Sequence, residues 1–407
     1  MRRADLAVLK HSQFRRLFIA RSVSVLGSSV AGIALAFAIL DLPTATPSKL
    51  GEVLAAMAVA RVVFILVGGV LGDRFSRSTI LSLGEFLSAL GSLGLGVALL
   101  SHTHNFLLLS GLAAIVGIGT GIFMPAMSGM VADVVDESQL RSANGLLRLV
   151  LNTVSVGGVG LAGFIVATIG GAWAMLLNSA AFLVSMLLLF SIKSRPMPRS
   201  KDSMFKQLRG GWKEFSSRSW IVSIVAAAFV INAFFGAVIG VFGPIIAKSQ
   251  LGGPAAWGLI TMTFSAGAIV GTFVALRIKS HRPLLLGVVC TAGIGLPALA
   301  LAVPMPVAII ALAGFLASIG LDIFSLGWDT ALQLHIPREA LSRVSAYDWL
   351  GSMVAVPLGL AVAGSALQAV GARTALLYSG GIMIVVALLP LLVPSVRTLT
   401  NDVSQST

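Results

Sequence analysis

Seven ionisable side chains lie within long apolar runs of this 407-residue sequence, and they are the residues best placed to do chemistry. They are Arg21, Arg61, Glu85, Arg148, Asp322, Asp329 and Asp348. A charge inside a membrane-spanning segment costs roughly 2.5–3.5 kcal/mol on insertion scales, so each one needs a partner, water or a role. The chemistry that such groups offer is the carriage of a proton or the formation of an ion pair.

Asp322 and Arg61 are the deepest charges of opposite sign, and they belong to opposite halves of the chain. A partly desolvated carboxylate holds a proton, and an approaching arginine displaces it. We therefore predict Asp322 as a proton carrier, with Arg61 and Arg148 as its coupling partners. The alternative is a permanent structural ion pair of Asp322 with either arginine. Asp41 is a further candidate, for which a solvated loop charge is the alternative.

Polar residues also form stripes with helical spacing on three apolar runs. Residues at i, i+4, i+7 and i+11 share one helix face. The three stripes are Ser318, Asp322, Ser325 and Asp329; Asn144, Arg148, Asn152 and Ser155; and Arg21, Ser24 and Ser28. We predict that these stripes line a water-accessible cavity. The alternative interpretation is that the polar side chains form hydrogen bonds between packed helices. Asn232 and Phe235 are added as substrate contacts, with packing as the alternative for the aromatic ring.

Two of the buried carboxylates have simpler explanations. Glu85 lies six residues into its run, so we expect it near the inner surface, paired with a basic loop residue. Asp348 is expected in the first turn of its helix, where the helix dipole stabilises a carboxylate.

The runs that carry these residues are long enough to cross a bilayer. A span needs about 20 mostly apolar residues. Breaks at charged, Pro and Gly-rich positions leave twelve runs, at 16–40, 50–71, 79–101, 106–131, 143–168, 172–192, 219–247, 256–276, 283–303, 307–332, 344–370 and 374–394. The sequence is 57% hydrophobic and only 11% charged, whereas an average soluble protein is about 25% charged. A soluble core is therefore excluded, and continuous Leu- and Ala-rich runs exclude a β-barrel.

The net charge of +13 sets an orientation and does not indicate nucleic-acid binding. Of the 28 Lys and Arg residues, 22 fall on the side that holds both termini, and only Lys49, Lys248 and Arg373 fall on the other. The positive-inside rule makes the first side cytoplasmic. We expect a multi-pass protein of the plasma (inner) membrane, with the lipid bilayer as its environment and both termini in the cytoplasm.

One long basic segment divides the runs six and six. The predicted domains are an N-terminal six-helix bundle at 1–192, a basic cytoplasmic linker at 193–218, a C-terminal six-helix bundle at 219–394 and a cytoplasmic tail at 395–407. Faint repeats recur in the same order in both halves, such as 71–74 with 274–277. Two parallel six-helix repeats form a transporter architecture in which the halves rock against each other.

The turn between the second and third runs reads GVLGDRFSRS from Gly69 to Ser78. It resembles the signature loop of the major facilitator superfamily, Gly-x-Leu-Ala-Asp-Arg-x-Gly-Arg-Arg/Lys. The starts of the fifth and eleventh runs, at 140–146 and 342–350, resemble the drug-efflux branch that includes macrolide-efflux and enterobactin-exporter-like proteins. This resemblance implies an all-α polytopic membrane protein with twelve transmembrane helices in two pseudo-symmetric bundles, and we expect a monomer.

The resemblance also implies a cytoplasmic latch that opens when the halves rock. Its residues are Asp73, Arg74, Arg77 and Arg141. Asp73 is expected to meet the start of the eleventh helix and Arg141. A carboxylate at a helix N-terminus and an arginine pair are both breakable contacts. Positive-inside anchoring alone is the alternative; it explains the arginines but not Asp73.

These features predict a secondary active transporter. Its expected function is proton-coupled export of amphipathic small molecules, such as drugs, macrolide-like compounds or siderophores, by alternating access. A lipid or lysophospholipid flippase of the same fold and a non-transporting membrane receptor or scaffold are the alternatives. The sequence contains no phosphate loop and no nucleophile with its base, and His102 and His104 alone do not make a metal site. We therefore expect no enzyme activity, cofactor or bound metal.

Overall fold

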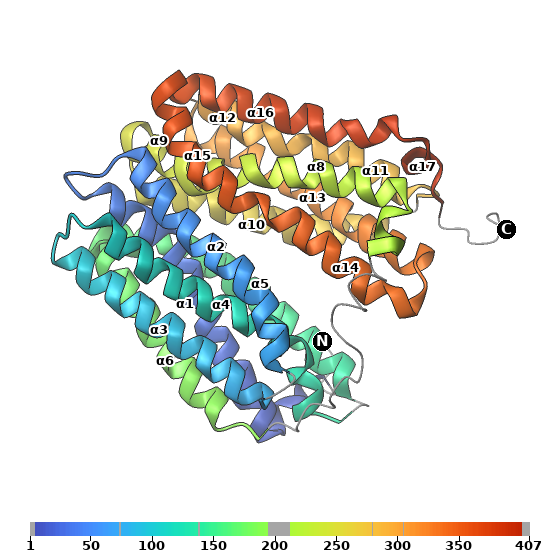
Figure 1. Ribbon diagram of the computed structural model, residues 1–407, viewed down its shortest axis with the longest axis horizontal. Coiled ribbons are helices and arrows are strands. Elements are labelled where there is room, and N and C mark those ends of the chain that lie inside the picture. The colour runs from blue at the N-terminus through green and yellow to red at the C-terminus, as the bar shows by residue number, and fades with distance from the viewer. Residues whose placement is uncertain are drawn as a thin grey trace. The chain divides into compact units, whose positions relative to one another are not determined.

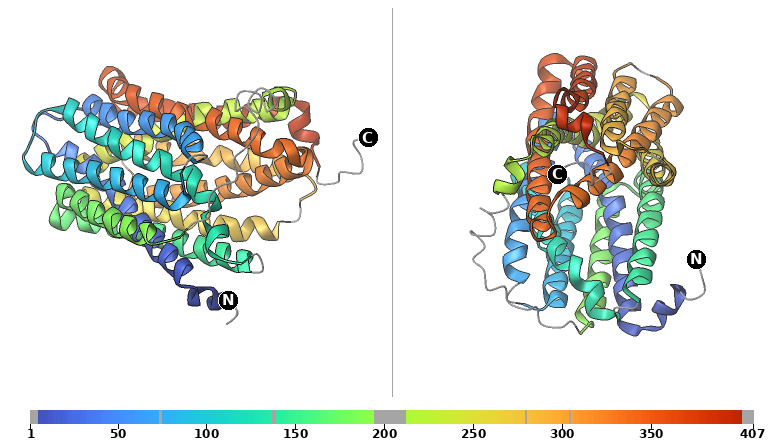
Figure 2. Two further views of the ribbon diagram at one scale, coloured as in Figure 1. Left: turned by 60° about the horizontal axis from the view of Figure 1, so that its bottom comes forward. Right: turned by 90° about the vertical axis from the view of Figure 1, so that its right-hand side faces the viewer.

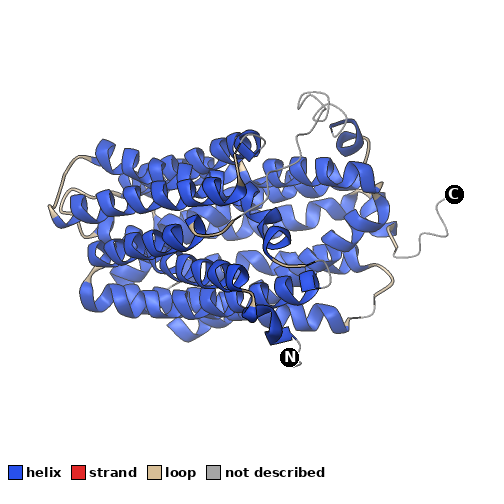
Figure 3. Cartoon of the chain, turned by 90° about the horizontal axis from the view of Figure 1, so that it is seen from below, coloured by secondary structure: helices blue, strands red, loops and turns tan. Residues whose placement is uncertain are grey.

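The computed structural model describes residues 5–72, 75–136, 139–193, 212–278, 280–303 and 305–400. Within these ranges all regular structure is helical (Figure 3). The chain divides into two compact units: residues 1–200 with 252–258, and residues 201–251 with 259–407. The all-α polytopic fold predicted from the sequence is confirmed.

The first unit contains the helices of the N-terminal half. They are η1 (Asp5–Lys10), α1 (Ser12–Leu40), α2 (Pro47–Gly72), α3 (Arg77–Leu100), α4 (Phe106–Val134), α5 (Leu140–Ile169) and α6 (Gly171–Phe190). Helix α4 packs between α2 and α3, α6 packs between α3 and α1, and α1 also contacts α5 (Figure 1). Figure 2 shows η1, in dark blue, as a short turn that leads into α1.

Polar caps and small residues explain these helices and their close packing. The side chains of Ser76 and Asn105 accept hydrogen bonds from the backbone N–H groups of Thr79 and Leu108, which fixes the starts of α3 and α4. A side chain at Gly117 would overlap the carbonyl oxygen of Met57, so this glycine lets α4 approach α2 closely.

The second unit contains the remaining helices, several of which are short pieces; the helix that starts at Pro254 has its residues up to Gly258 in the first unit. They are α8 (Ser219–Ala237), η3 (Val238–Phe242, a π-helical turn), α9 (Gly243–Gln250), α10 (Pro254–Arg277), α11 (Pro283–Thr291), η4 (Ala292–Gly295), α12 (Leu296–Ala302), α13 (Val307–His335), α14 (Arg338–Met353), α15 (Ala355–Val370), α16 (Ala372–Leu388), η5 (Leu389–Leu392) and α17 (Pro394–Thr398). Helix α8 lies beside α15, α14 and α16, and α11 packs on α13.

Prolines account for three of the interruptions. A proline inside a helix removes one backbone hydrogen bond and clashes with the carbonyl four residues earlier. The residue four positions before Pro244 lies in η3, and the residue four positions before Pro297 lies in η4. The residue four positions before Pro357 is Met353, where α14 ends. The predicted seventh, ninth and eleventh spans are therefore each built from more than one helical piece.

Eleven helical segments within the described residues are long and apolar enough to cross a membrane. Their limits lie within a few residues of the predicted ones; the predicted run 79–101, for example, is observed as Arg77–Leu100. The remaining predicted run, 50–71, corresponds to α2, a 26-residue helix that is not among those eleven. The chain is therefore a multi-pass membrane protein.

Candidate functional site

A cavity of about 220 Å³ lies inside the second unit. Its walls come from α8, α11, α13, α14, α16 and η5, and sixteen residues line it. Most of these are aliphatic or aromatic. Asp348 is the one charged residue among them, and Asn232, Thr291 and Ser352 supply the other polar side chains.

Asp348 is held by neutral hydrogen-bond donors. The indole Nε1 of Trp328 donates to its Oδ2 atom at 2.9 Å, and the hydroxyl of Ser352 donates to its Oδ1 atom at 3.5 Å. Helix α14 begins at Arg338, so Asp348 lies more than two turns inside the helix. The prediction that Asp348 caps the first turn is therefore wrong; a helix start near residue 344 was assumed, and the polar sequence before it is helical as well.

The cavity adjoins the break between α14 and α15. The side-chain amide of Asn232 on α8 donates to the backbone carbonyl oxygen of Ser352 at 3.1 Å. Carbonyls beside an interrupted span need such partners, because lipid offers none. Asn232, a predicted cavity residue, thus lines the cavity and supports its wall. Phe235 instead packs against Phe264, with ring centroids 5.6 Å apart.

Asp322 lies on α13, outside the residues that line this cavity. It is half-buried, and the hydroxyl of Thr272 on α10 donates to its Oδ1 atom at 3.3 Å. Two other members of its stripe have different surroundings: Ser318 is buried with no hydrogen-bond partner for its hydroxyl, and Ser325 is exposed. Pairing of Asp322 with an arginine of the first unit stays a prediction.

A buried charge cluster lies inside the first unit. Glu85 on α3 is only 2% exposed, and the hydroxyl of Ser185 on α6 donates to its Oε1 atom at 2.9 Å. Ser24 on α1 also hydrogen-bonds this carboxylate, and Arg21 attracts it through space. The Arg21 guanidinium lies 4.6 Å from the centroid of the Phe123 ring. The predicted pairing of Glu85 with a loop residue is wrong, because the cation beside it belongs to the span α1.

The cluster is incompletely hydrogen-bonded. Two of its buried atoms, Glu85 Oε2 and Arg21 Nε, have no hydrogen-bond partner. Arg21 and Ser24, which were predicted to line a cavity, belong to this cluster. Buried polar groups without partners are rare in native structures and often occur at functional positions.

A second cavity, of about 120 Å³, also lies in the first unit. Its polar lining residues are Ser28, Arg61, Thr120 and Asn178. The Nε atom of Arg61 donates to the hydroxyl of Thr120 at 3.2 Å, and the Asn178 amide donates to Ser92 at 3.0 Å. The structure thus brings together two predicted residues, Ser28 and Arg61. Asn178 was missed, although it is the only amide in the run of the sixth span.

The other predicted residues lie apart from both cavities. On α5, Arg148 and Asn152 are exposed and Ser155 is half-buried, and none of them lines either cavity. Asp41 is the exposed C-cap residue of α1.

The predicted latch is described only at Arg77. Asp73, Arg74 and the side chain of Arg141 lie outside the described residues. Arg77, the first residue of α3, forms an ion pair with Asp133 near the end of α4, with 2.6 Å between Nη1 and Oδ1. This contact stays within the first unit and joins two neighbouring helices at one end.

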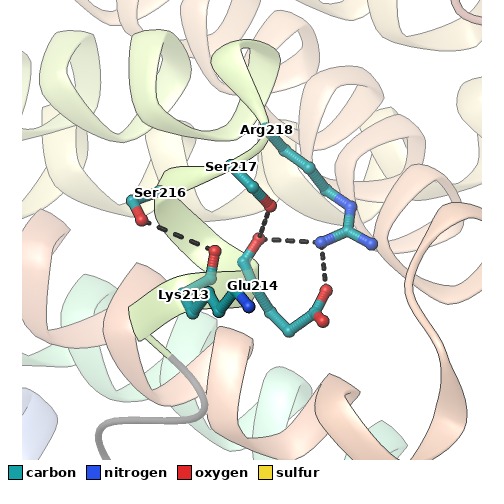
Figure 4. A network of polar contacts seen from close by, with 5 residues as sticks. All are labelled: Lys213, Glu214, Ser216, Ser217 and Arg218. Atoms are coloured by element: carbon teal, nitrogen blue, oxygen red, sulfur yellow. Dashed lines mark hydrogen bonds and ion pairs between the residues drawn. The ribbon is translucent and has the colours of Figure 1, made fainter.

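The end of the predicted linker forms a helical turn, residues 212–216, that precedes α8 (Figure 4). Arg218 Nη1 donates to both the backbone carbonyl and the Oε2 atom of Glu214, at 2.7 and 2.5 Å. This hydrogen bond and the arginine charge hold the pKa of the Glu214 carboxyl below its usual range. The rings of Trp212 and Phe215 both contact Tyr347, which ties this turn to α14.

A polytopic helical fold with polar clusters and cavities inside each unit is typical of membrane transporters. Residues 17–348 match the family model described as Major Facilitator Superfamily. Because that match covers most of the sequence, the chain belongs to this superfamily. The resemblance inferred from the signature loop is confirmed, and the protein is a transporter and not an enzyme.

Related proteins match over nearly their whole length. The chain is 26% identical to the enterobactin exporter EntS of Salmonella typhimurium over 397 residues, covering 96% of this chain and 94% of that protein. It is 27% identical to the enterobactin exporter EntS of Citrobacter koseri over 401 residues, covering 97% and 95%.

Two solved structures share the fold. A crystal structure of the nucleoside transporter NupG superposes with a TM-score of 0.71 at 13% identity, covering 95% of this chain and 100% of that one. A bacterial homologue of the iron transporter ferroportin, in its inward-facing state, gives a TM-score of 0.68 at 17% identity, covering 92% and 98%.

Proposed function

We propose that this chain is a secondary active exporter that exchanges protons for amphipathic small molecules by alternating access. Export is supported by the enterobactin exporters that match along about 95% of their length. Coupling to protons is supported by one observation above the others. Asp322 is a half-buried carboxylate inside an apolar span, and the hydroxyl of Thr272 donates to it over a long 3.3 Å hydrogen bond.

Asp322 suits proton carriage better than Glu85 does. A carrier must exchange its proton with water and must change charge without breaking the fold. Glu85 is enclosed, hydrogen-bonded to Ser185 and attracted by Arg21, so a change in its charge would disturb three helices. Asp322 keeps access to its surroundings and forms a weaker contact.

The coupling follows from the cost of placing a charge in a nonpolar environment. When Asp322 is ionised, conformations in which water surrounds its carboxylate are favoured. When Asp322 is protonated, conformations that exclude water from its carboxyl group become accessible. A proton that enters from the acidic side and leaves on the other side then biases the cycle in one direction. Arg61 and Arg148 are the proposed partners that promote proton release.

The chain is proposed to act as a monomer in the inner membrane with both termini in the cytoplasm. The excess of Lys and Arg on the side of the termini supports this orientation. A fluorescent protein fused to the C-terminus should be fluorescent, and an alkaline phosphatase fused there should be inactive; the reverse pattern contradicts the orientation.

Accumulation in whole cells tests the proposed function. Cells that express the chain should retain less of at least one compound from a panel of cationic dyes, macrolides and enterobactin than cells with an empty vector. An uncoupler should remove this difference, because it collapses the proton gradient. Export that persists in the uncoupler contradicts proton coupling, and no expression-dependent change for any compound favours a flippase or a scaffold.

A further inference from the structure

The cavity of the second unit combines one carboxylate with an aromatic wall. Phe324, Trp328 and Trp349 line it together with Asp348, and its other lining residues are uncharged. A carboxylate together with tryptophan and phenylalanine rings is the combination that binds organic ammonium ions, through charge attraction and cation–π contacts. This points to a positively charged, partly aromatic ligand.

The negative charge of the cavity is not neutralised by its hydrogen-bond donors. Trp328 and Ser352 donate to the Asp348 carboxylate, and both are neutral groups. A cation entering the cavity is attracted by the Asp348 carboxylate, whereas an anion is repelled by it.

Two of the three rings of the aromatic wall, those of Phe324 and Trp328, are held in place before any ligand arrives. The Trp328 ring stacks on Phe324, with centroids 6.1 Å apart and an interplanar angle of 17°, and it meets Trp220 edge to face at 5.4 Å. Its indole N–H is fixed by Asp348. Rings that are already positioned lose little conformational freedom on binding.

The volume limits the size of the ligand. A dry cavity of roughly 150 Å³ in another protein holds benzene, and pockets for drug-sized ligands are about 300–1,000 Å³. At about 220 Å³, this cavity accommodates one aromatic ring with a short alkyl ammonium group. A macrolide or a siderophore exceeds this volume.

We propose that this cavity binds a small aryl-alkyl ammonium ion, with Asp348 as its counter-ion and Phe324, Trp328 and Trp349 as its aromatic wall. That the bound ammonium ion is also transported rests on the proposed export function. That it binds rests on the cavity alone, and the experiment measures binding.

The test uses the purified full-length chain in detergent and three probes of matched size. Phenylpropylamine is a cation at pH 7, phenylpropanol is neutral and phenylpropanoate is an anion. Titration calorimetry should show the amine binding at least about tenfold more tightly than the alcohol, a difference of about 1.4 kcal/mol. The anion should show no saturable binding. Equal binding of the amine and the alcohol overturns the inference.

Three variants assign the binding to the cavity. Asp348→Asn keeps an acceptor for Trp328 but loses the charge, so it should weaken amine binding at least about tenfold and leave alcohol binding within about twofold. Trp349→Leu keeps an apolar side chain but loses the ring face, and it should weaken amine binding more than alcohol binding. Glu52→Gln, at an exposed carboxylate paired with Lys49, is the control and should bind all three probes as the wild type does.

Unchanged amine binding in both Asp348→Asn and Trp349→Leu overturns the assignment. If Asp348→Asn fails to fold, binding of the three probes to the wild type and to the Trp349→Leu variant still shows whether the cavity binds the ammonium ion. The outcome is separable from the proposed function: amine binding without export of any compound leaves the inference standing, and export without amine binding removes the inference alone.

Discussion

Glu85 and Arg21 show how a buried charge pair is held inside a span. The carboxylate has one hydrogen-bonded oxygen and one without a partner, and the guanidinium lies over the Phe123 ring. Removing one member of a buried pair leaves the other charge uncompensated, which destabilises by about 3–5 kcal/mol, whereas removing both charges is often nearly neutral.

We therefore predict that Glu85→Gln lowers the free energy of unfolding by about 3 kcal/mol or more, and that Glu85→Gln combined with Arg21→Met recovers most of this loss. Unfolding in mixed detergent micelles, followed by circular dichroism, measures both. Glu52→Gln breaks an exposed pair with Lys49 and should change stability by less than about 1 kcal/mol. A double variant no more stable than Glu85→Gln would show that the two charges are not coupled.

At the residue scale, the sequence identified the ionisable residues within the spans, but it did not identify the residues that contact them. Every ionisable residue in an apolar run stands out because the surrounding composition is so uniform. Partners depend on how helices pack: Ser185 and Phe123 carry no signal of their own among many similar residues. Asp348 was misassigned because the start of its helix was set at Val344, where the continuous apolar run begins, six residues after the observed start at Arg338.

Broken helices distinguish the second unit at the scale of elements. Three interruptions follow from prolines, and the one at Met353 lies beside the candidate cavity. Breaks of this kind are tolerated in spans where neighbouring groups satisfy the freed backbone, as Asn232 does for Ser352. The prolines are present in the sequence, but each of these apolar runs is long enough for one span, and the hydrophobicity pattern therefore predicts one continuous helix for each.

Close contact between α8 and α15 depends on a glycine just beyond this break. A side chain at Gly359 would overlap the carbonyl oxygen of Ala233, and it would lie 2.8 Å from the Cα atom of that residue. Because the obstacle is backbone, it moves only if the helices separate. Overpacking of this kind destabilises by about 1–3 kcal/mol or more.

We predict that Gly359→Val sharply reduces the yield of folded, monodisperse protein in fluorescence-detected size-exclusion chromatography. Gly381→Val on α16 is the matched control, because nothing lies within 4 Å of the added Cβ atom there, and its yield should stay close to that of the wild type. Equal yields for the two variants would contradict the packing of α15 on α8.

At the scale of the whole molecule, the fold was predictable because lipid imposes strong constraints on a chain. Long apolar runs must be helices, and the signature loop from Gly69 to Ser78 pointed to the superfamily that the family model then identified. The cavities were less predictable. Each is formed by side chains from several helices, and the polar stripes of the sequence mark a helix face without saying which neighbour covers it.

The central claim is that Asp322 carries the proton that drives export, and proton flux in liposomes tests it most directly. The purified chain is reconstituted with a pH-sensitive dye inside, a pH gradient is imposed, and a compound that the chain expels from cells is added. The wild type should couple substrate movement to proton movement. Asp322→Asn should lose at least about nine-tenths of the coupled flux, a change of about 1.4 kcal/mol or more in the coupling barrier, while still exchanging substrate without a gradient. Full gradient-driven flux in Asp322→Asn would contradict the account.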